Sequence, residues 1–191
     1  MSRACWRSKA RASLPVLFAM ALVVVIVQEH PGTTRSVATA GGPPSSRGYV
    51  LGPGDGEALN VPNGRVVIKV DPKTGSSRLA MGTQVLTQGN GIALHLHERE
   101  DEILFLHEGA RTVVVGDATK MVAKGTTVYI PHGVWHGVMS ANDEAQVVWI
   151  VSPPGLEEFF REVGTAPGIP PRALTLERLA DIRRKHGMKS P

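Results

Sequence analysis

Two clusters of histidine and turn-forming residues at fixed spacings, the first of which also holds a glutamate, constrain the fold of this chain more than any other feature. In both clusters, turn-forming residues alternate with side chains that commonly bind metals. They consist of Gly89, His95, His97, Glu102 and Gly109, and of Gly125, Pro131, Gly133 and His136. Three imidazoles and one carboxylate form a ligand set for a single transition-metal ion. The sequence therefore predicts a metal site at His95, His97, Glu102 and His136.

Strand geometry explains how these four side chains can meet. Side chains alternate across a strand, so His95 and His97 point to the same face. The charged segment 98–101 then turns the chain back and places Glu102 at the start of the neighbouring strand. His136 begins a later strand, which a closed barrel would bring close to the histidine pair.

The pattern of short segments predicts an all-β fold. These segments are rich in β-branched residues or alternate in polarity, and glycine or proline separates them, as in an antiparallel sandwich or barrel. The predicted strands are 65–71, 79–88, 92–97, 102–107, 111–115, 120–123, 126–130, 136–139 and 146–152.

The C-terminal part changes from a strand pattern to a helical one. Apolar residues recur at helical spacing over 156–163, which predicts a short amphipathic helix. A second helix is predicted after Thr175, whose hydroxyl suits an N-cap. The basic residues 183–186 fall in its last turn, where positive charge suits the helix dipole. We interpret them as helix-end chemistry and not as a binding patch.

The N-terminus has the layout of an export signal. Basic residues at 3–11 precede an uncharged apolar run at 14–27, and an Ala-x-Ala pattern follows at 38–40. These features predict a signal peptide over 1–40 and a secreted or periplasmic protein. An uncleaved membrane anchor over 12–28 is the alternative, and it would be the protein's only contact with the membrane.

Charge and cysteine content narrow the remaining classes. Residues 1–40 hold five of the 21 Lys and Arg and one of the 17 Asp and Glu, so the rest of the chain is electrically balanced. Nothing in it favours nucleic acid as a partner. The single cysteine, Cys5, lies in the predicted signal, which leaves nitrogen and oxygen as the available metal ligands. We divide the remainder into a linker (41–48), a barrel (49–153) and a helical tail (154–191).

The two clusters resemble the signature motifs of the cupin family of β-barrel proteins. The first motif, Gly-x5-His-x-His-x3–4-Glu-x6-Gly, is matched at every position. The second, Gly-x5-Pro-x-Gly-x2-His-x3-Asn, is matched except that Ser140 stands at the final position. The resemblance spans 48–163. The flanks 51–57 and 152–163 also resemble those of single-domain bacterial cupins of the quercetin dioxygenase type.

This resemblance implies a jelly-roll β-barrel with His95, His97, Glu102 and His136 as ligands of one divalent transition metal: iron, manganese, nickel, copper or zinc. In quercetinase-like enzymes the carboxylate that matches Glu102 also takes the substrate's proton, so the resemblance gives Glu102 a catalytic role. Cupin barrels often pair through edge strands, which makes a homodimer a candidate assembly.

Several nearby residues are expected to lie outside the metal site. His107 has the opposite strand parity from Glu102 and should face away, and His132 should be solvated on a turn. Acidic residues at 98–101 are expected in a charged turn, although a shift in register would bring Glu100 into play. Trp135 is a candidate for the pocket mouth or for ordinary packing. The pocket wall is expected to include Ile92, Leu104, Val128, Val138 and Trp149.

Three functions are compatible with these features. The leading hypothesis is a metal-dependent oxidoreductase of the dioxygenase type, acting on a small aromatic or enolisable compound. The second is a non-catalytic module that binds a small molecule or the metal itself. The third is a redox-neutral sugar isomerase or epimerase, which would need Lys69, Arg78 or Lys120 to line the barrel. We interpret these three as outward-facing strand residues.

Overall fold

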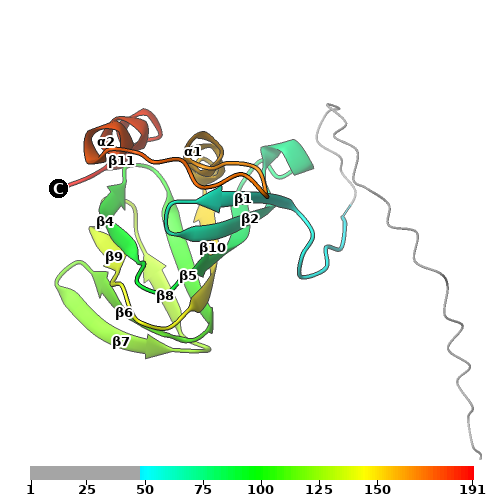
Figure 1. Cartoon of the computed structure of the whole chain (residues 1–191). Coiled ribbons are helices and arrows are strands. Elements are labelled where there is room, and N and C mark those ends of the chain that lie inside the picture. Colours follow the sequence, from blue (N-terminus) through cyan, green and yellow to red (C-terminus); the bar gives the residue numbers. More distant parts are fainter. Residues whose placement is uncertain (1–47) are drawn as a thin grey trace, which may run out of the picture. The chain divides into compact units, whose positions relative to one another are not determined.

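The computed structural model describes residues 48–191 (Figure 1). The predicted signal peptide or anchor, and the predicted linker up to residue 47, lie outside the described residues. Between residues 48 and 191 no helix is both long and apolar enough to cross a membrane. The elements are β1 (Glu57–Val61), β2 (Gly64–Val70), a 3-10 turn η1 (Pro72–Thr74), β3 (Ala80–Leu86), β4 (Ile92–His97), β5 (Asp101–Glu108), β6 (Ala110–Val115), β7 (Ala118–Ala123), β8 (Thr127–Ile130), β9 (His136–Val138), β10 (Ala145–Ser152), α1 (Leu156–Val163), α2 (Leu176–Lys185) and β11 (Met188–Lys189).

The strands form two antiparallel sheets, which confirms the predicted all-β jelly-roll fold with a C-terminal helical tail. One sheet has the order β1-β2-β3-β10-β5-β8, and the other has the order β11-β4-β9-β6-β7. Strands far apart in sequence are therefore neighbours, as β10 is between β3 and β5 and β9 is beside β4. Each strand predicted between residues 65 and 152 is present, with bounds within two residues of those expected.

The hydrophobic core lies between the two sheets. Buried and half-buried residues alternate along β3 and β10, because every second side chain of a strand points inward. Trp149 on β10 is 1% exposed and belongs to the same cluster as Leu104 on β5 and Val138 on β9. This packing joins the two sheets whose strands carry the four predicted ligands.

The C-terminal tail completes both the core and one sheet. Phe160 of α1 and Ile182 of α2 are buried in the same hydrophobic cluster. Thr175 caps α2 by accepting a hydrogen bond from the backbone N–H of Arg178, as the sequence predicts. Beyond α2, β11 pairs with β4 so that Met188 lies opposite His97. The tail is thus joined directly to the strand that carries two of the predicted ligands.

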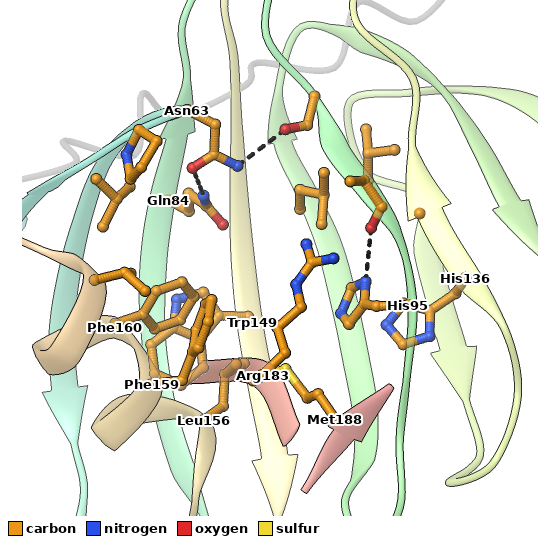
Figure 2. A pocket seen from close by; sticks show the side chains of 18 of the residues that line it. Asn63, Gln84, His95, His136, Trp149, Leu156, Phe159, Phe160, Arg183 and Met188 are labelled. Carbon is orange, nitrogen blue, oxygen red and sulfur yellow. Dashed lines mark hydrogen bonds between the residues drawn. The ribbon is translucent and has the colours of Figure 1, made fainter. Parts of the chain in front are cut away.

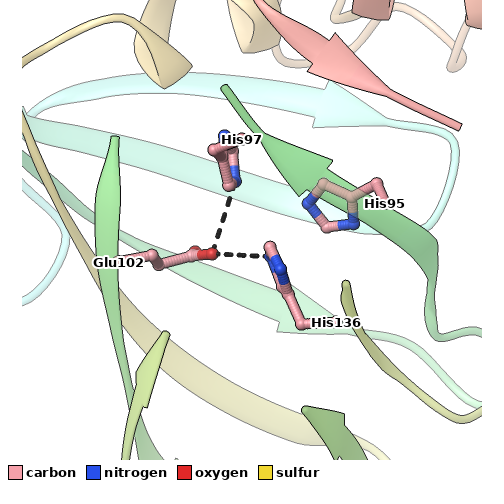
Figure 3. Close-up of side chains that lie close together, drawn as sticks. All are labelled: His95, His97, Glu102 and His136. Atoms are coloured by element: carbon pink, nitrogen blue, oxygen red, sulfur yellow. Dashed lines mark ion pairs between the residues drawn. The ribbon is translucent and has the colours of Figure 1, made fainter. Parts of the chain in front are cut away.

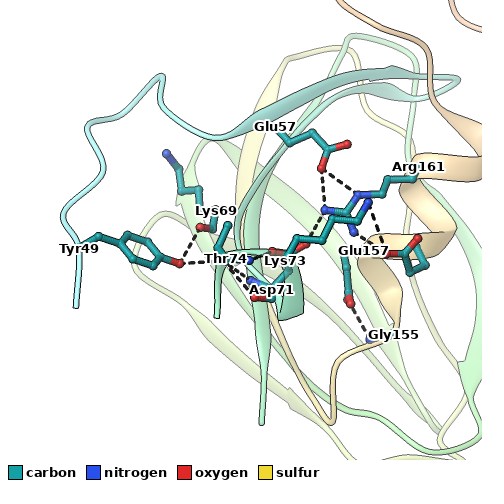
Figure 4. A network of polar contacts seen from close by, with 10 residues as sticks. Tyr49, Glu57, Lys69, Asp71, Lys73, Thr74, Gly155, Glu157 and Arg161 are labelled. Atoms are coloured by element: carbon teal, nitrogen blue, oxygen red, sulfur yellow. Dashed lines mark hydrogen bonds and ion pairs between the residues drawn. The ribbon is translucent and has the colours of Figure 1, made fainter. Parts of the chain in front are cut away.

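A polar network fastens α1 to the first strands (Figure 4). Arg161 on α1 donates hydrogen bonds to Glu57 on β1 and to Asp71, whose carboxylate is fully buried at the N-cap of η1. It also donates to Glu158 on its own helix at 2.7 Å. Burial lowers the pKa of Arg161, but its hydrogen bonds to Glu57 and Asp71 outweigh that effect and raise it. The guanidinium therefore stays charged and neutralises the buried carboxylate.

Glycine makes the turns of the two clusters sterically accessible. Gly89, Gly109, Gly125 and Gly133 all have positive φ angles, between 77° and 88°. At Gly109 a Cβ atom would also lie 2.7 Å from the backbone oxygen of Glu144. This turn between β5 and β6 therefore needs glycine for both conformation and space.

Candidate metal centre

The four predicted ligands converge between the two sheets (Figure 3). His95 and His97 lie on β4, and His136 on β9 is the cross-strand partner of His95. Glu102 comes from β5 in the opposite sheet. Each of the four side chains is 6% exposed or less, and one ligand atom from each lies within 4.8 Å of the others. This buried cluster could hold a metal ion.

Hydrogen bonds fix the orientation of two of the imidazoles. Nδ1 of His95 lies 2.9 Å from the carbonyl oxygen of Ala93, and Nδ1 of His136 lies 2.9 Å from that of Val134. A carbonyl oxygen can only accept, so each Nδ1 carries the proton. In a neutral ring the opposite nitrogen, Nε2, then has a free lone pair. This is the tautomer that a metal-binding histidine requires.

The inner atoms of the cluster have no hydrogen-bond partners among the described residues. Nε2 of His97, Nε2 of His136 and Oε2 of Glu102 are all buried and unsatisfied. Oε2 of Glu102 lies 3.0 Å from Nε2 of His136 and 3.4 Å from Nε2 of His97. Electron-pair donors held this close, out of contact with water, are stabilised by a shared cation. The donor set therefore fits a divalent transition metal.

The electrostatics of the cluster favour the forms that bind metal. Burial, together with the neighbouring His136 and His97, lowers the pKa of His95 to about 3. Burial raises the pKa of Glu102, but contacts with His136 and His97 outweigh this and hold it well below its usual range. At neutral pH, His95 is therefore neutral and Glu102 anionic, the forms in which each could bind a metal.

The shifted pKa of His95 predicts acid sensitivity of the metal-free protein. Below its ordinary pKa of 6.5 the unfolded chain binds a proton that folded His95 does not bind until about pH 3. Stability is therefore lost as the pH falls from 6.5 towards 3, by up to about 1.4 kcal/mol per pH unit from this group. Urea unfolding of chelator-treated protein at pH 7 and pH 5 should show a loss of about 2 kcal/mol that is smaller in His95→Gln. An equal loss of unfolding free energy in the wild type and in His95→Gln would show that His95 is not the cause.

Glu100 lies beside the cluster, the alternative that the sequence leaves open for it. It was expected in a charged turn, but it is 1% exposed, and its Oε2 lies 3.8 Å from Nδ1 of His97. The N-cap residue of α1, Gly155, packs so closely that a Cβ atom there would lie 2.4 Å from Oε1 of Glu100. Glu100 thus lies behind His97, on the side away from Glu102, at the positive end of the α1 dipole. Neither oxygen of Glu100 has a hydrogen-bond partner among the described residues, so Glu100 acts on His97 through its charge, which raises the basicity of the ring.

Replacing Glu100 with glutamine is expected to weaken metal binding by about 10- to 100-fold. The change keeps the shape of the side chain but removes the negative charge behind His97. Competition titration with a chromophoric chelator would measure the affinity. Glu98→Gln is the matched control, because Glu98 is exposed and pairs with Lys189 on β11. Equal affinities for the two variants would show that Glu100 does not support His97.

The other residues considered from the sequence lie away from the cluster. His107 is exposed, as its strand parity predicts. His132 is largely solvent-exposed on its turn and contacts the carboxylate of Asp101 at 2.9 Å. Trp135 is half-buried and does not line the pocket described below. Neither His107 nor His132 belongs to the cluster of predicted ligands.

A cavity of about 170 Å³ adjoins the cluster (Figure 2). His95, Glu102 and His136 line it, whereas His97 does not, so the centre can be reached from one side. Of the expected wall residues, Ile92, Leu104, Val138 and Trp149 are present, but Val128 instead packs against the core. The remaining wall includes apolar residues of the tail: Leu156, Phe159, Phe160, Val163, Leu179 and Met188.

The sequence also does not predict which basic residue lines the cavity. Lys69, Arg78 and Lys120, the basic residues considered for a sugar-binding barrel, do not line it. The side chain of Lys69 instead donates hydrogen bonds to three backbone oxygens between residues 52 and 55. The basic residue that does line the cavity is Arg183 on α2. Arg183 is one of several basic residues at the end of α2, and nothing in the sequence indicates that its side chain points inward.

The two-sheet barrel with a three-histidine, one-carboxylate cluster defines a protein of the cupin type. The family model for the cupin domain matches residues 82–153. An uncharacterized protein of Streptomyces coelicolor is 32% identical over 76 residues, which are 40% of this chain and 71% of that protein. The chain belongs to the cupin family. All four clustered residues fall inside the matched segment.

Two solved structures show the same fold at low sequence identity. An RmlC-like cupin from Shewanella frigidimarina aligns with a TM-score of 0.51 and 18% identity, covering 59% of this chain and 96% of that one. The polyketide cyclase RemF from Streptomyces resistomycificus also aligns with a TM-score of 0.51 and 18% identity, covering 70% and 91%. These similarities show the fold alone, because one fold hosts many activities.

Proposed function

We propose that this protein is an exported, metal-dependent oxidoreductase of the dioxygenase type that acts on a small aromatic or enolisable compound. The observation that carries the proposal is the buried cluster of three imidazoles and one carboxylate with a mostly apolar cavity beside it. A redox-active divalent ion bound there would supply Lewis acidity and the ability to activate dioxygen.

The residues around the cavity suit an aromatic or enolisable substrate better than a sugar. Most of the lining is aliphatic or aromatic, and the amide of Gln84 is already paired with Asn63 at 3.0 Å. A sugar would leave its hydroxyl groups without partners on such a wall, which is unfavourable. The space also matters, because a cavity of about 150 Å³ holds one benzene ring. A cavity of about 170 Å³ thus favours single-ring compounds over larger ones.

Glu102 is the candidate general base. It lines the cavity, and its pKa lies below its usual range, so it is ionised at neutral pH. Glu102 could accept the proton of a substrate hydroxyl or enol, because a metal ion held at the cluster would lower the pKa of that group. The apolar walls exclude bulk water and offer contacts to the apolar body of the substrate. This assignment extends to Glu102 the role that its resemblance to quercetinase-like enzymes implies.

Oxygen consumption tests the proposed activity. Protein loaded in turn with iron, manganese, nickel and copper is incubated aerobically with single-ring catechols, other enediol compounds and, as larger substrates, flavonols. Uptake of oxygen and incorporation of two atoms of 18O into the product are expected with at least one metal. Absence of uptake with all four metals would overturn the assignment. A ligand that still raised the melting temperature of the metal-loaded protein would then indicate a binding module.

The proposal that the protein is exported rests on the order of basic, apolar and Ala-x-Ala segments in residues 1–40. Cleavage after Ala40 would leave a mature chain that starts at Gly41. N-terminal sequencing of the protein recovered from the periplasm or medium tests this directly. Recovery of the intact N-terminus in the membrane fraction would instead support the anchor over 12–28.

A further inference from the structure

Arg183 brings a positive charge into the cavity from outside the barrel. It lies in the last turn of α2, and its half-buried side chain points into the cavity on the side of His95 (Figure 2). Burial of Ile182 and pairing of β11 with β4 fix this end of the helix. One guanidinium nitrogen donates to the hydroxyl of Ser190 at 2.9 Å, which further sets the side-chain direction.

The charge of Arg183 is not neutralised within the described residues. No carboxylate oxygen between residues 48 and 191 lies within 4.0 Å of its guanidinium, whereas the adjacent Arg184 and Lys185 pair with Asp181 and Glu162. Burial lowers the pKa of Arg183, which shows that the charged form is partly desolvated. A guanidinium remains protonated at neutral pH even so. A partly buried, unpaired cation is stabilised by an anion from outside the protein.

Apart from the metal cluster, the fully buried polar atoms of the cavity residues that lack a partner among the described residues are hydrogen-bond donors. Nε of Arg183 and Nε1 of Trp149 are both buried without a partner among the described residues. The amides of Asn63 and Gln84, by contrast, are engaged with each other and with the backbone oxygen of Gly91. A ligand that offers hydrogen-bond acceptors would therefore satisfy these donors better than a ligand that offers donors.

From these contacts we infer that the cavity binds a small monocarboxylate with an apolar body, and that Arg183 pairs with its carboxylate. One guanidinium balances one negative charge, which favours a carboxylate over a doubly charged phosphate. The apolar walls and the volume of about 170 Å³ accommodate a body of about one ring. This inference rests on the cavity of the proposed function and narrows the substrate to an acid whose other end faces Glu102 and His136.

Binding of benzoate and of the neutral, similarly shaped benzamide tests the inference independently of turnover. Calorimetric titration is carried out on the protein with one equivalent of zinc and again after chelation. Benzoate is expected to bind more tightly than benzamide in both states. Arg183→Met should weaken benzoate binding by about 10- to 100-fold and leave benzamide unchanged, because a charge-assisted hydrogen bond is lost. Arg183→Lys should fall between the wild type and Arg183→Met.

Arg184→Met is the matched control, because Arg184 is exposed and pairs with Asp181. Its benzoate affinity should equal that of the wild type. Benzoate binding that disappears on chelation and is insensitive to Arg183→Met would overturn the inference, since the metal would then be the carboxylate site. If Arg183→Met fails to fold, the wild-type protein still tests the inference. Benzoate that binds no more tightly than benzamide after chelation would overturn it. The titration does not measure oxygen uptake, so its result is independent of whether the protein is a dioxygenase.

Discussion

Changing both His95 and His97 to alanine is expected to lower the affinity for a divalent transition metal by at least about 1,000-fold. The change removes two of the three imidazoles and leaves only His136 and Glu102 of the buried cluster. Loss of an outer-shell partner alone costs about 10- to 100-fold, and loss of a direct ligand costs more. Elemental analysis of the purified protein, followed by competition titration, would measure metal content and affinity.

The matched control is the double change of His107 and His132 to alanine. Both residues are exposed histidines of the same barrel, and neither belongs to the cluster. This variant should retain one equivalent of metal with wild-type affinity. Full metal content in the His95, His97 variant, or equal losses in both variants, would contradict the assigned centre. Circular dichroism of each protein checks that the barrel has folded.

Replacing Arg161 with methionine is expected to destabilise the protein by about 3–5 kcal/mol. Methionine keeps much of the apolar stem but leaves the carboxylate of Asp71 buried without its cation (Figure 4). Removing one partner of a buried ion pair carries a penalty of this size. The link between α1 and β1 through Glu57 is lost as well. Urea unfolding of the wild type and the variant would measure the difference in the free energy of unfolding.

Arg184→Met provides the comparison for an exposed ion pair. Arg184 and Asp181 lie one helical turn apart with side chains 67% and 45% exposed. Exposed pairs contribute about 0–1 kcal/mol, so this variant should unfold almost as the wild type does. A loss below about 1 kcal/mol in Arg161→Met would show that Asp71 does not depend on Arg161.

The strands from β2 to β10 and the grouping of the ligands were predictable from local patterns. Alternation and β-branched residues marked the strands, and glycine marked the turns where φ is positive. The shared face of His95 and His97 followed from strand parity alone. The addition of His136 followed from barrel closure, which brought it opposite His95.

What could not be predicted depends on contacts between distant segments. β1 has no clear alternation in sequence and is defined by pairing with β2, and β11 is two residues long and is defined by pairing with β4. Glu100 looks like any acidic turn residue until α1 packs over it. Arg183 likewise belongs to a basic helix end, and only the docking of α2 turns it into the cavity.

The most direct test of the account is a crystal structure of the protein soaked with a divalent transition metal, with diffraction data on both sides of its absorption edge. One anomalous peak is expected within about 2.0–2.2 Å of the Nε2 atoms of His95, His97 and His136 and of a Glu102 oxygen. A peak at another position, or none at this cluster in metal-saturated crystals, would contradict the claim that these four side chains hold a single ion.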